Sequence, residues 1–385
     1  MDKYTKGVLA VLVLLTGCQT TGLKEWGENK NIPSSYRPNL ETVRHHFQEY
    51  NTRGTSYRFD TDPSPTPRAL EFSLRTEPKV QRELNSASVA SYLMYENERV
   101  VIDEMSPDGR LGDLIDNETM IYSMSLGKSL GGYLIGHAIC KGYIESVDSS
   151  LSDWPLVAGT LLEQATVRDV INATMGDQRF VDNNDLSSGR DVGDVTIRDL
   201  VINELASSDP SPKRYNYGQL PANVAFNYIS YKTGHQFKTF LNEIMREHVG
   251  LNGTLKLNHI SRGEEHGPIQ ANFKATRYDT LRIGIAILED WKDDTCVGKY
   301  LKDVYANRVP KGRFPESSAT YAKSYAGFFH TDYRGIDDVV MGMEGYGGIR
   351  MLINFTDQRI IYIHSVHRDY DRRGSYLKPI ETGQF

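Results

Sequence analysis

The stretch that most constrains the fold is the tetrapeptide Ser125-Leu-Gly-Lys128, followed by an apolar run from Ser129 to Ile144. Because Ser125 and Lys128 are three residues apart, a helix that begins at Ser125 places both side chains on one face. The Ser125 N–H then lies among the unpaired donors at the positive end of the helix dipole. The stretch predicts a buried helix that brings a hydroxyl, an amine and a backbone donor together.

Four glycines in this stretch allow neighbouring backbone to approach the predicted helix closely: Gly127, Gly131, Gly132 and Gly136. A lysine in such a helix is desolvated, which favours the neutral amine, and a neutral amine can act as a general base. A Ser-x-x-Lys pattern is weak by itself, since a chain of this length holds roughly one by chance. The alternative is an N-cap serine with a lysine that reaches out to solvent.

An acyl-transfer enzyme requires a nucleophile, a base and donors for the oxyanion. The chain contains no Gly-x-Ser-x-Gly motif, and its histidines are scattered without a recognisable triad context. A Ser–Lys pair is the remaining solution, which favours Ser125 as nucleophile and Lys128 as base.

The N-terminus has the features of a bacterial export signal. Two lysines precede a short apolar run, Val8–Leu15, which is too short to span a bilayer. The run ends in Leu-Thr-Gly-Cys18, which resembles a lipobox, so we expect residues 1–17 to be removed and Cys18 to carry a lipid. Gln19 after the cysteine fits a cell-envelope lipoprotein of the outer membrane that faces the periplasm. The alternative is an ordinary secretory signal with a chance cysteine.

The other two cysteines, Cys140 and Cys296, could be bridged in an exported protein. Cys140 lies in the apolar run, which favours a buried free thiol instead. No Cys or His pair has zinc-ligand spacing, so we expect no metal. The net charge of −6 and the absence of a basic stripe argue against a nucleic-acid partner.

Residues 18–85 form a polar segment that we expect to be a lipid-anchored arm or linker, followed by one catalytic domain at 86–385. Its proline-rich part, Asp60–Pro67, cannot be helical and predicts a linker or a wrapping arm. Thr42–Tyr50 is a candidate short helix. The segment from Gly176 to Asp194 is predicted to be a long polar loop.

The domain is predicted to have strands at both ends and helices between them. Ala90–Tyr95 and Arg99–Asp103 form a hairpin, and further strands are expected at 326–330, 348–354 and 359–366. Helices are expected after Thr166 and Thr196, up to Thr233, and over 237–249 and 278–291. This order predicts an α/β (α+β) fold: an antiparallel sheet flanked by helices, with an inserted helical region.

Several motifs in this order resemble the serine β-lactamase-like hydrolases, closest to the branch of class C β-lactamases, esterases and 6-aminohexanoate-dimer hydrolases. The motifs are the hairpin, Tyr122-Ser-Met-Ser-Leu-Gly-Lys128, Gly142-Tyr-Ile-Glu-Ser-Val-Asp148, Thr166-Val-Arg-Asp-Val170, Tyr215-Asn-Tyr217 and Gly345-Tyr-Gly-Gly348. The resemblance covers residue 88 to the C-terminus. It implies a β-lactamase or penicillin-binding-protein fold.

By this resemblance Ser125 matches the family nucleophile and Lys128 its partner. The family then has a catalytic tyrosine in an aromatic-x-Tyr-Ser-Asn or aromatic-x-Tyr-Asn-Ser setting. Both Tyr215 and Tyr217 are candidates for it. Counting back from Thr233 favours Tyr217 as the catalytic tyrosine and places Tyr215 on the leading aromatic, as a substrate-binding residue. Gly218 and Gln219 depart from the usual pair. Either tyrosine could instead be a core aromatic.

The third family motif is Lys-Thr-Gly or His-x-Gly on an edge strand, and here it reads Met343-Glu-Gly345. The resemblance implies that the Tyr346 N–H is the second oxyanion donor, after the Ser125 N–H. Met343 replaces the cation that normally helps to hold a substrate carboxylate. Arg350 and His364 are candidates to substitute for it.

Together these features predict an exported serine hydrolase that cleaves an ester or amide through a Ser125 acyl-enzyme, with Lys128 as base and no cofactor. The alternatives are a β-lactamase or peptidoglycan DD-peptidase, and a non-catalytic lipoprotein that uses the fold as a binding module. The expected partners are a small ester or amide substrate and, through the lipid anchor, a membrane. The sequence makes no prediction about oligomeric state.

Overall fold

The computed structural model describes residues 40–52, 58–86, 88–176, 212–259, 269–312, 321–365 and 373–385. The predicted leader, the lipidation site at Cys18, the polar loop from Asp177 onward and the Thr196 helix lie outside these ranges. The boundary between arm and domain stays a prediction.

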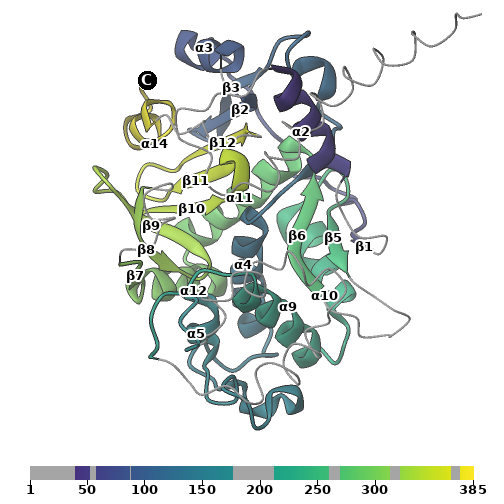
Figure 1. Cartoon of the computed structure of the whole chain (residues 1–385), viewed down its shortest axis with the longest axis vertical. Coiled ribbons are helices and arrows are strands. Elements are labelled where there is room, and N and C mark those ends of the chain that lie inside the picture. Colours follow the sequence, from purple (N-terminus) through teal and green to yellow (C-terminus); the bar gives the residue numbers. More distant parts are fainter. Residues whose placement is uncertain are drawn as a thin grey trace, which may run out of the picture.

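The main sheet has eight antiparallel strands in the order β3-β2-β12-β11-β10-β9-β8-β7 (Figure 1). Its strands are β2 (Val89–Glu96), β3 (Arg99–Met105), β7 (Val309–Pro310), β8 (Ala322–Ala326), β9 (Phe329–Tyr333), β10 (Val340–Glu344), β11 (Arg350–Asn354) and β12 (Arg359–Ser365). The predicted β2–β3 hairpin is confirmed. Strand β12 pairs with β2, so the sheet joins the two ends of the domain, as predicted.

Two predictions about this sheet are wrong. The single strand expected at 326–330 is interrupted, because Gly327 and Phe328 take positive φ values of 58° and 66° and form a turn between the end of β8 and the start of β9. Strand β10, which carries Met343, is not at an edge, because β9 and β11 pair with its two sides.

A second, four-stranded sheet was not predicted. It contains β1 (Arg58–Asp60), β5 (Lys256–His259), β6 (Ile269–Ala275) and β4 (Ile121–Tyr122), in that order. The proline-rich segment after β1 lies along the body: the N–H groups of Thr61 and Ser64 donate to the carbonyls of Leu255 and Leu251. Of the two predicted roles, this segment is therefore a wrapping arm.

The helices lie largely between the two sheets and below them in Figure 1. They are α2 (Leu40–Thr52), α3 (Pro78–Ser86), α4 (Leu126–Cys140), α5 (Val167–Ile171), α9 (Leu220–Lys232), α10 (Phe237–Glu243), α11 (Arg277–Lys292), α12 (Cys296–Ala306) and α14 (Leu377–Thr382). Helix α10 continues as the π-helical segment η5 (Ile244–Val249). Single 3-10 turns are η1 (Gly112–Leu114), η2 (Leu151–Asp153), η3 (Pro155–Val157), η6 (Tyr346–Gly348) and η7 (Arg373–Ser375).

Helix α4 is the buried helix predicted after Ser125. Every residue from Leu126 to Ala138 is buried. A Cβ on Gly132 would lie 1.9 Å from the carbonyl oxygen of Gly327, and one on Gly127 would lie 2.1 Å from that of Ala271. Only glycine fits at these two positions, so the helix packs directly against neighbouring backbone. None of the described helices meets the length and hydropathy needed to cross a membrane.

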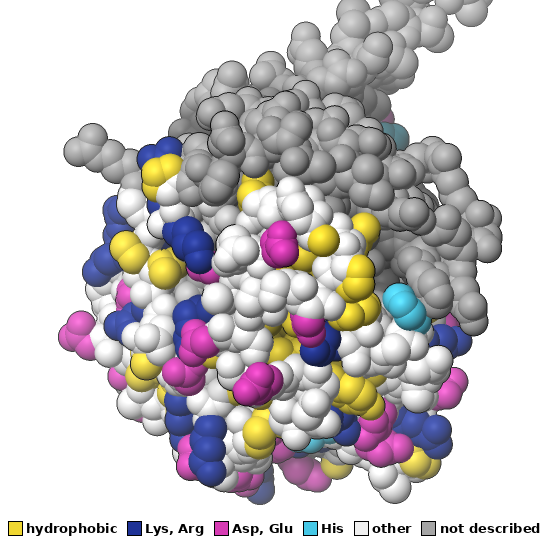
Figure 2. Space-filling model, turned by 90° about the horizontal axis from the view of Figure 1, so that it is seen from below, with side chains coloured by type: hydrophobic (Ala, Val, Ile, Leu, Met, Phe, Trp, Pro, Cys, Tyr) yellow, Lys and Arg dark blue, Asp and Glu magenta, His cyan; other side chains and the backbone are white. Residues whose placement is uncertain are grey.

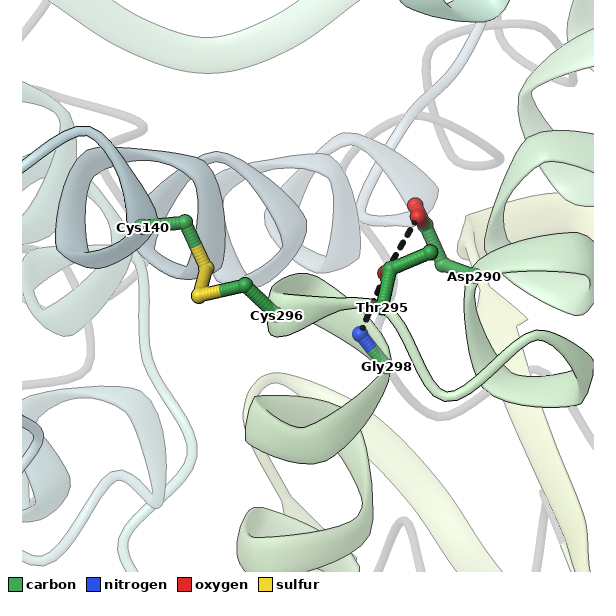
Figure 3. Close-up of a disulfide and its surroundings, with 5 residues drawn as sticks. All are labelled: Cys140, Asp290, Thr295, Cys296 and Gly298. Carbon is green, nitrogen blue, oxygen red and sulfur yellow. Dashed lines mark hydrogen bonds between the residues drawn. A yellow bond between two sulfur atoms is a disulfide. The ribbon is translucent and has the colours of Figure 1, made fainter.

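Cys140 and Cys296 form a disulfide, so the prediction of a free thiol at Cys140 is wrong (Figure 3). Cys140 is the last residue of α4 and Cys296 the first of α12. The apolar residues before Cys140 predict that it is buried, but they do not show that its side chain faces the first residue of α12.

The surface drawn in Figure 2 carries Lys and Arg side chains interspersed with Asp and Glu side chains. The described part of this face therefore has no extended patch of one charge.

Candidate active site

Ser125 lies at the junction between β4 and α4. It is the N-cap of α4, and the preceding Met124 has a positive φ of 50°. Ser123 fixes the turn, because its N–H donates to the Phe273 carbonyl at 2.8 Å and its hydroxyl accepts from the Phe273 N–H at 2.9 Å. A non-glycine residue in this conformation costs energy, and such strained turns are typical of functional sites.

Lys128 lies beside Ser125, as the helical spacing predicts. Its Nζ is 3.0 Å from Ser125 Oγ and 2.7 Å from Gln219 Oε1. The residue is buried, with 3 % of its surface exposed. Burial lowers the pKa of Lys128 from 10.5 to about 7, since the charged form loses its water. A large neutral fraction is therefore present near neutral pH, and the neutral amine can accept the Ser125 hydroxyl proton.

Gln219, which departs from the family pattern, is a site residue that was not predicted. It lies two residues after Tyr217, at the place of the usual asparagine. Its amide oxygen accepts from Lys128, and its Nε2 donates to Asn223 Oδ1 at 3.1 Å. The offset from the tyrosine was a usable signal, since glutamine carries the same carboxamide as asparagine.

The two candidate tyrosines occupy different places. The Tyr217 ring centre is 5.1 Å from Lys128 Nζ, within cation–π range. Tyr215 is buried, and its ring packs 5.1 Å from that of Tyr325. Both tyrosine rings therefore pack on Tyr325, the Tyr217 ring at 6.2 Å, and the Tyr217 ring also contacts the Lys128 amine.

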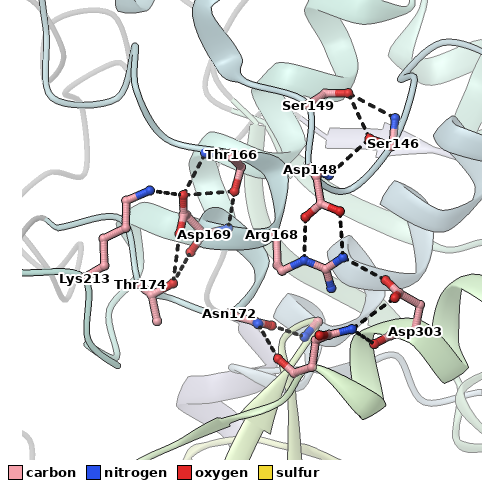
Figure 4. Close-up of polar contacts among 12 residues, drawn as sticks. Ser146, Asp148, Ser149, Thr166, Arg168, Asp169, Asn172, Thr174, Lys213 and Asp303 are labelled. Atoms are coloured by element: carbon pink, nitrogen blue, oxygen red, sulfur yellow. Dashed lines mark hydrogen bonds and ion pairs between the residues drawn. The ribbon is translucent and has the colours of Figure 1, made fainter.

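The segment that carries these tyrosines is tied to α5. The Asn216 N–H donates to the Ala173 carbonyl at 2.8 Å, and Lys213 Nζ donates to Asp169 at 2.6 Å (Figure 4). Asp169 also completes a capping box with Thr166, which confirms the predicted start of α5.

Helix α5 is itself held by charged partners. Arg168 donates to Asp148 at 2.7 and 3.0 Å and to Asp303 at 3.0 Å (Figure 4). The pair beside Tyr217 therefore depends on a scaffold built from residues distant in sequence.

Gly345 brings the end of β10 against the Ser125 turn. A Cβ at Gly345 would lie 2.9 Å from both Met124 Cβ and the Ser123 carbonyl oxygen, so a larger residue does not fit. Its N–H donates to the Ile349 carbonyl at 2.8 Å. The backbone of Tyr346 follows directly, and its side chain is exposed. This contact places the backbone of Gly345 and Tyr346 beside the turn that carries Ser125.

The two residues considered as substitutes for the missing cation make other contacts. Arg350 lies 3.9 Å from Glu344 and stacks on the Tyr376 ring at 4.0 Å. His364 packs against Phe47 at 5.4 Å, and burial lowers its pKa to about 3. Neither forms a hydrogen bond or ion pair with Ser125 or Lys128 among the described residues. Met343 is fully buried in the core.

A buried cation that was not predicted contacts His330, whose ring is a neighbour of the Tyr217 ring. Lys311 Nζ is 2.5 Å from Nδ1 of His330, and both residues are buried. The His330 ring is 6.3 Å from the Tyr217 ring. Burial, and then the charge of Lys311, hold the pKa of His330 well below its usual range, so the imidazole is neutral and accepts from Lys311. No local sequence signal links these two residues, since Lys311 follows β7 and His330 lies on β9.

No protein-family model and no curated protein matches the chain. Solved structures match at low identity. A Bacillus anthracis protein designated a 6-aminohexanoate-dimer hydrolase aligns with a TM-score of 0.60 at 13% identity, over 88% of this chain and 92% of its own. A D-stereospecific amidohydrolase from a Streptomyces species aligns with a TM-score of 0.58 at 14% identity, over 81% of this chain and 100% of its own. A penicillin-binding protein from Bacillus halodurans aligns with a TM-score of 0.54 at 14% identity, over 78% of this chain and 98% of its own.

These neighbours share one architecture, in which helices and an antiparallel sheet combine as they do here. Identities of this size establish the fold and leave the chemistry to the residues of the site. The chain has the serine β-lactamase-like fold that its motifs predict.

Proposed function

We propose that this protein is an exported serine hydrolase that cleaves an ester or amide through an acyl-enzyme on Ser125. The observation that carries the proposal is the 3.0 Å contact between Ser125 Oγ and Nζ of Lys128, whose pKa burial lowers to about 7. A binding module has no use for a desolvated amine beside a hydroxyl, because burying the amine costs stability.

In the proposed reaction the neutral Lys128 amine takes the proton of Ser125 Oγ as the oxygen attacks the substrate carbonyl carbon. The N–H groups of Ser125 and Tyr346 donate to the oxyanion. The Tyr217 phenol passes a proton to the leaving alcohol or amine as its bond to the carbonyl breaks, and it regains a proton from the protonated Lys128, whose amine is then neutral again. Water then attacks the acyl-enzyme and gives a proton to Lys128, and this proton returns to Ser125 Oγ as the acid leaves.

The surroundings favour a neutral ester or amide over a penicillin. Strand β10 presents the buried Met343 where the family pattern has a cation, so a substrate carboxylate lacks its usual partner there. A β-lactamase or DD-peptidase is the second candidate. The observation in its favour is the buried Lys311, which contacts His330 next to Tyr217.

Export is supported by the disulfide, because such bonds persist in oxidising compartments. We propose that the leader is cut before Cys18 and that a lipid on this cysteine anchors the protein to the outer membrane, facing the periplasm. Radiolabelled palmitate should enter the wild-type protein and not the Cys18→Ser variant. Incorporation into both would exclude the proposed anchor.

Activity is tested by labelling the mature protein with a fluorophosphonate and a fluorescent penicillin, followed by mass mapping. We expect an adduct on Ser125 that Ser125→Ala lacks and that a variant of the exposed Ser152, Ser152→Ala, retains. Hydrolysis of p-nitrophenyl esters without turnover of nitrocefin would identify the esterase. If neither probe labels the folded wild-type protein, the hydrolase proposal fails in favour of the binding module.

A further inference from the structure

Three side chains that could ligate a metal meet on the side of α4 remote from Ser125. They are His137 on α4, His248 on the π-helical segment η5 and Asp290 on α11. One donor atom from each lies within 4.8 Å of the other two. His137 is nine residues after Lys128, so this cluster is separate from the proposed active site.

Asp290 is buried, with 2% of its side chain exposed, and hydrogen bonds to both carboxylate oxygens fix its orientation. Its Oδ2 accepts from the Tyr133 hydroxyl at 2.5 Å and lies 2.9 Å from His248 Nε2. Its Oδ1 accepts from the Thr295 hydroxyl at 2.7 Å (Figure 3). Among the described residues, no lysine or arginine forms an ion pair with this carboxylate. A buried charge without a permanent counter-ion is costly.

His137 provides the second indication of a ligand. Its Nε2 is fully buried and has no hydrogen-bond partner among the described residues. Its ring lies 4.8 Å from the His248 ring and 4.7 Å from the Tyr133 ring. An orphaned buried nitrogen beside a buried carboxylate is unusual unless a ligand completes it.

We propose that His137, His248 and Asp290 bind a divalent transition metal such as zinc. Two imidazoles and one carboxylate with an open position are a common donor set for such ions. Zinc bonds these donors at about 2.0–2.2 Å, which puts tetrahedral ligand atoms ~3.3 Å apart. The widest separation in the cluster must therefore close, while the 2.9 Å contact between His248 and Asp290 opens slightly.

The exposed side of the cluster can supply that movement. The His248 side chain is 41% exposed, which gives the ion a route in and gives the ring freedom to move. Tyr133 and Thr295 already hold the carboxylate, as outer partners of metal ligands do. π-Helical segments are rare in proteins, and those that occur often lie at functional sites. Here the π-helical segment η5 carries His248.

The position of the cluster indicates a structural role for the ion. It would join α4, η5 and α11 close to the disulfide that joins α4 to α12. Binding to the folded state alone then raises the free energy of unfolding with the logarithm of the free ion concentration, once that concentration exceeds Kd.

Isothermal titration of the EDTA-treated mature protein with zinc tests the proposal. We expect one ion per chain and a higher thermal midpoint in its presence. The His248→Ala variant, which changes an exposed residue and should fold normally, should bind at least ~100-fold more weakly. The matched control is His45→Ala, which removes an exposed histidine on α2 and should bind like the wild type.

Zinc-edge X-ray absorption of the loaded protein should show two imidazole ligands, and Asp290→Asn should also weaken binding. Absence of stoichiometric binding to folded wild-type protein would overturn the proposal. Equal affinity in His248→Ala and wild type would overturn it as well, because the ion would then lie elsewhere.

Discussion

Burial of Lys128 lowers the stability of the folded protein at neutral pH and, in the proposed mechanism, provides the catalytic base. The folded-state pKa of Lys128 is about 7, against 10.5 for an ordinary lysine. Between these pH values the unfolded chain binds more protons than the folded one. The free energy of unfolding therefore increases as the pH rises from about 7 towards 10.5. The protein carries this cost at neutral pH in order to keep an amine beside Ser125.

Replacing the amine should reveal that cost. We expect Lys128→Met to be inactive and yet more stable at pH 7, by about 1–3 kcal/mol after allowing for the lost Gln219 hydrogen bond. Urea denaturation followed by circular dichroism measures the change. A Lys128→Met protein that is less stable than wild type would show that the amine is held in its charged form.

The same pKa predicts the pH dependence of the reaction. If the neutral amine is the base, kcat/KM for a neutral ester should rise through pH 7 as Lys128 loses its proton, and level off above it. A pH–rate profile between pH 5 and 9 provides the measurement. A rate that does not change across this range would exclude Lys128 as the titrating base.

The positions of the two tyrosines predict unequal effects on turnover. Tyr217→Phe should lower kcat by roughly 10²-fold or more, because it removes a proton donor next to Lys128. Tyr215→Phe keeps the ring that packs on Tyr325 and should have a small effect. Steady-state kinetics of both folded variants decides between them. The opposite ranking would assign the catalytic role to Tyr215.

At this scale the sequence predicts only what local spacing can encode. The contact between Ser125 and Lys128 follows from helical periodicity, and the Tyr217 register follows from counting along one helix. The Lys311–His330 pair has no such signal, because strand pairing brings the two residues together across separate segments.

At the scale of the element, α4 shows why its glycines are required. The helix is buried on all sides, and backbone carbonyls of Gly327 and Ala271 lie where side chains would begin. The helix can approach two sheets at once only because these positions lack a Cβ.

Adding one methyl group should test this packing. Gly132→Ala places a Cβ 1.9 Å from the Gly327 carbonyl oxygen, so we expect a loss of about 3 kcal/mol or more. The control is Gly159→Ala, where φ is +73° but no atom lies within 4 Å, and it should cost about 1 kcal/mol. Chemical denaturation of both variants gives the comparison; equal losses would mean that α4 can shift to accommodate the methyl group.

Elements with a strong local pattern were predicted well, and those defined by partners were not. Helices α4, α9 and α11 and the β2–β3 hairpin match their predictions closely. The four-stranded sheet was missed because its strands are short and drawn from four separate segments. The turn between β8 and β9 was read as a strand because Phe328 and Phe329 are apolar, while the positive φ of Phe328 is imposed by its surroundings.

At the scale of the molecule, the disulfide closes a loop between residues 156 positions apart. Such a link restricts the unfolded chain, so its reduction should lower stability by about 2–4 kcal/mol. The double variant Cys140→Ser/Cys296→Ser should show the same loss in urea without a reducing agent. A reductant that changes nothing in the wild type would indicate that the thiols are not bridged in solution.

The wrong prediction for Cys140 and the unforeseen histidine–aspartate cluster have one cause. Composition around Cys140 describes its own helix, and the residues His137, His248 and Asp290 are too far apart in sequence to form a motif. Only tertiary structure brings such side chains to one place.

The pairing of β12 with β2 also determines when the sheet can form during synthesis. Glu96 on β2 and Arg359 on β12 are 263 residues apart and joined at 3.0 Å. Closing so long a loop is entropically costly, and at about 5–20 residues per second the ribosome delivers β12 long after β2. Until then β2 and β11 each keep an open edge. A chain truncated before Arg359 should therefore fail to fold and should aggregate through these edges.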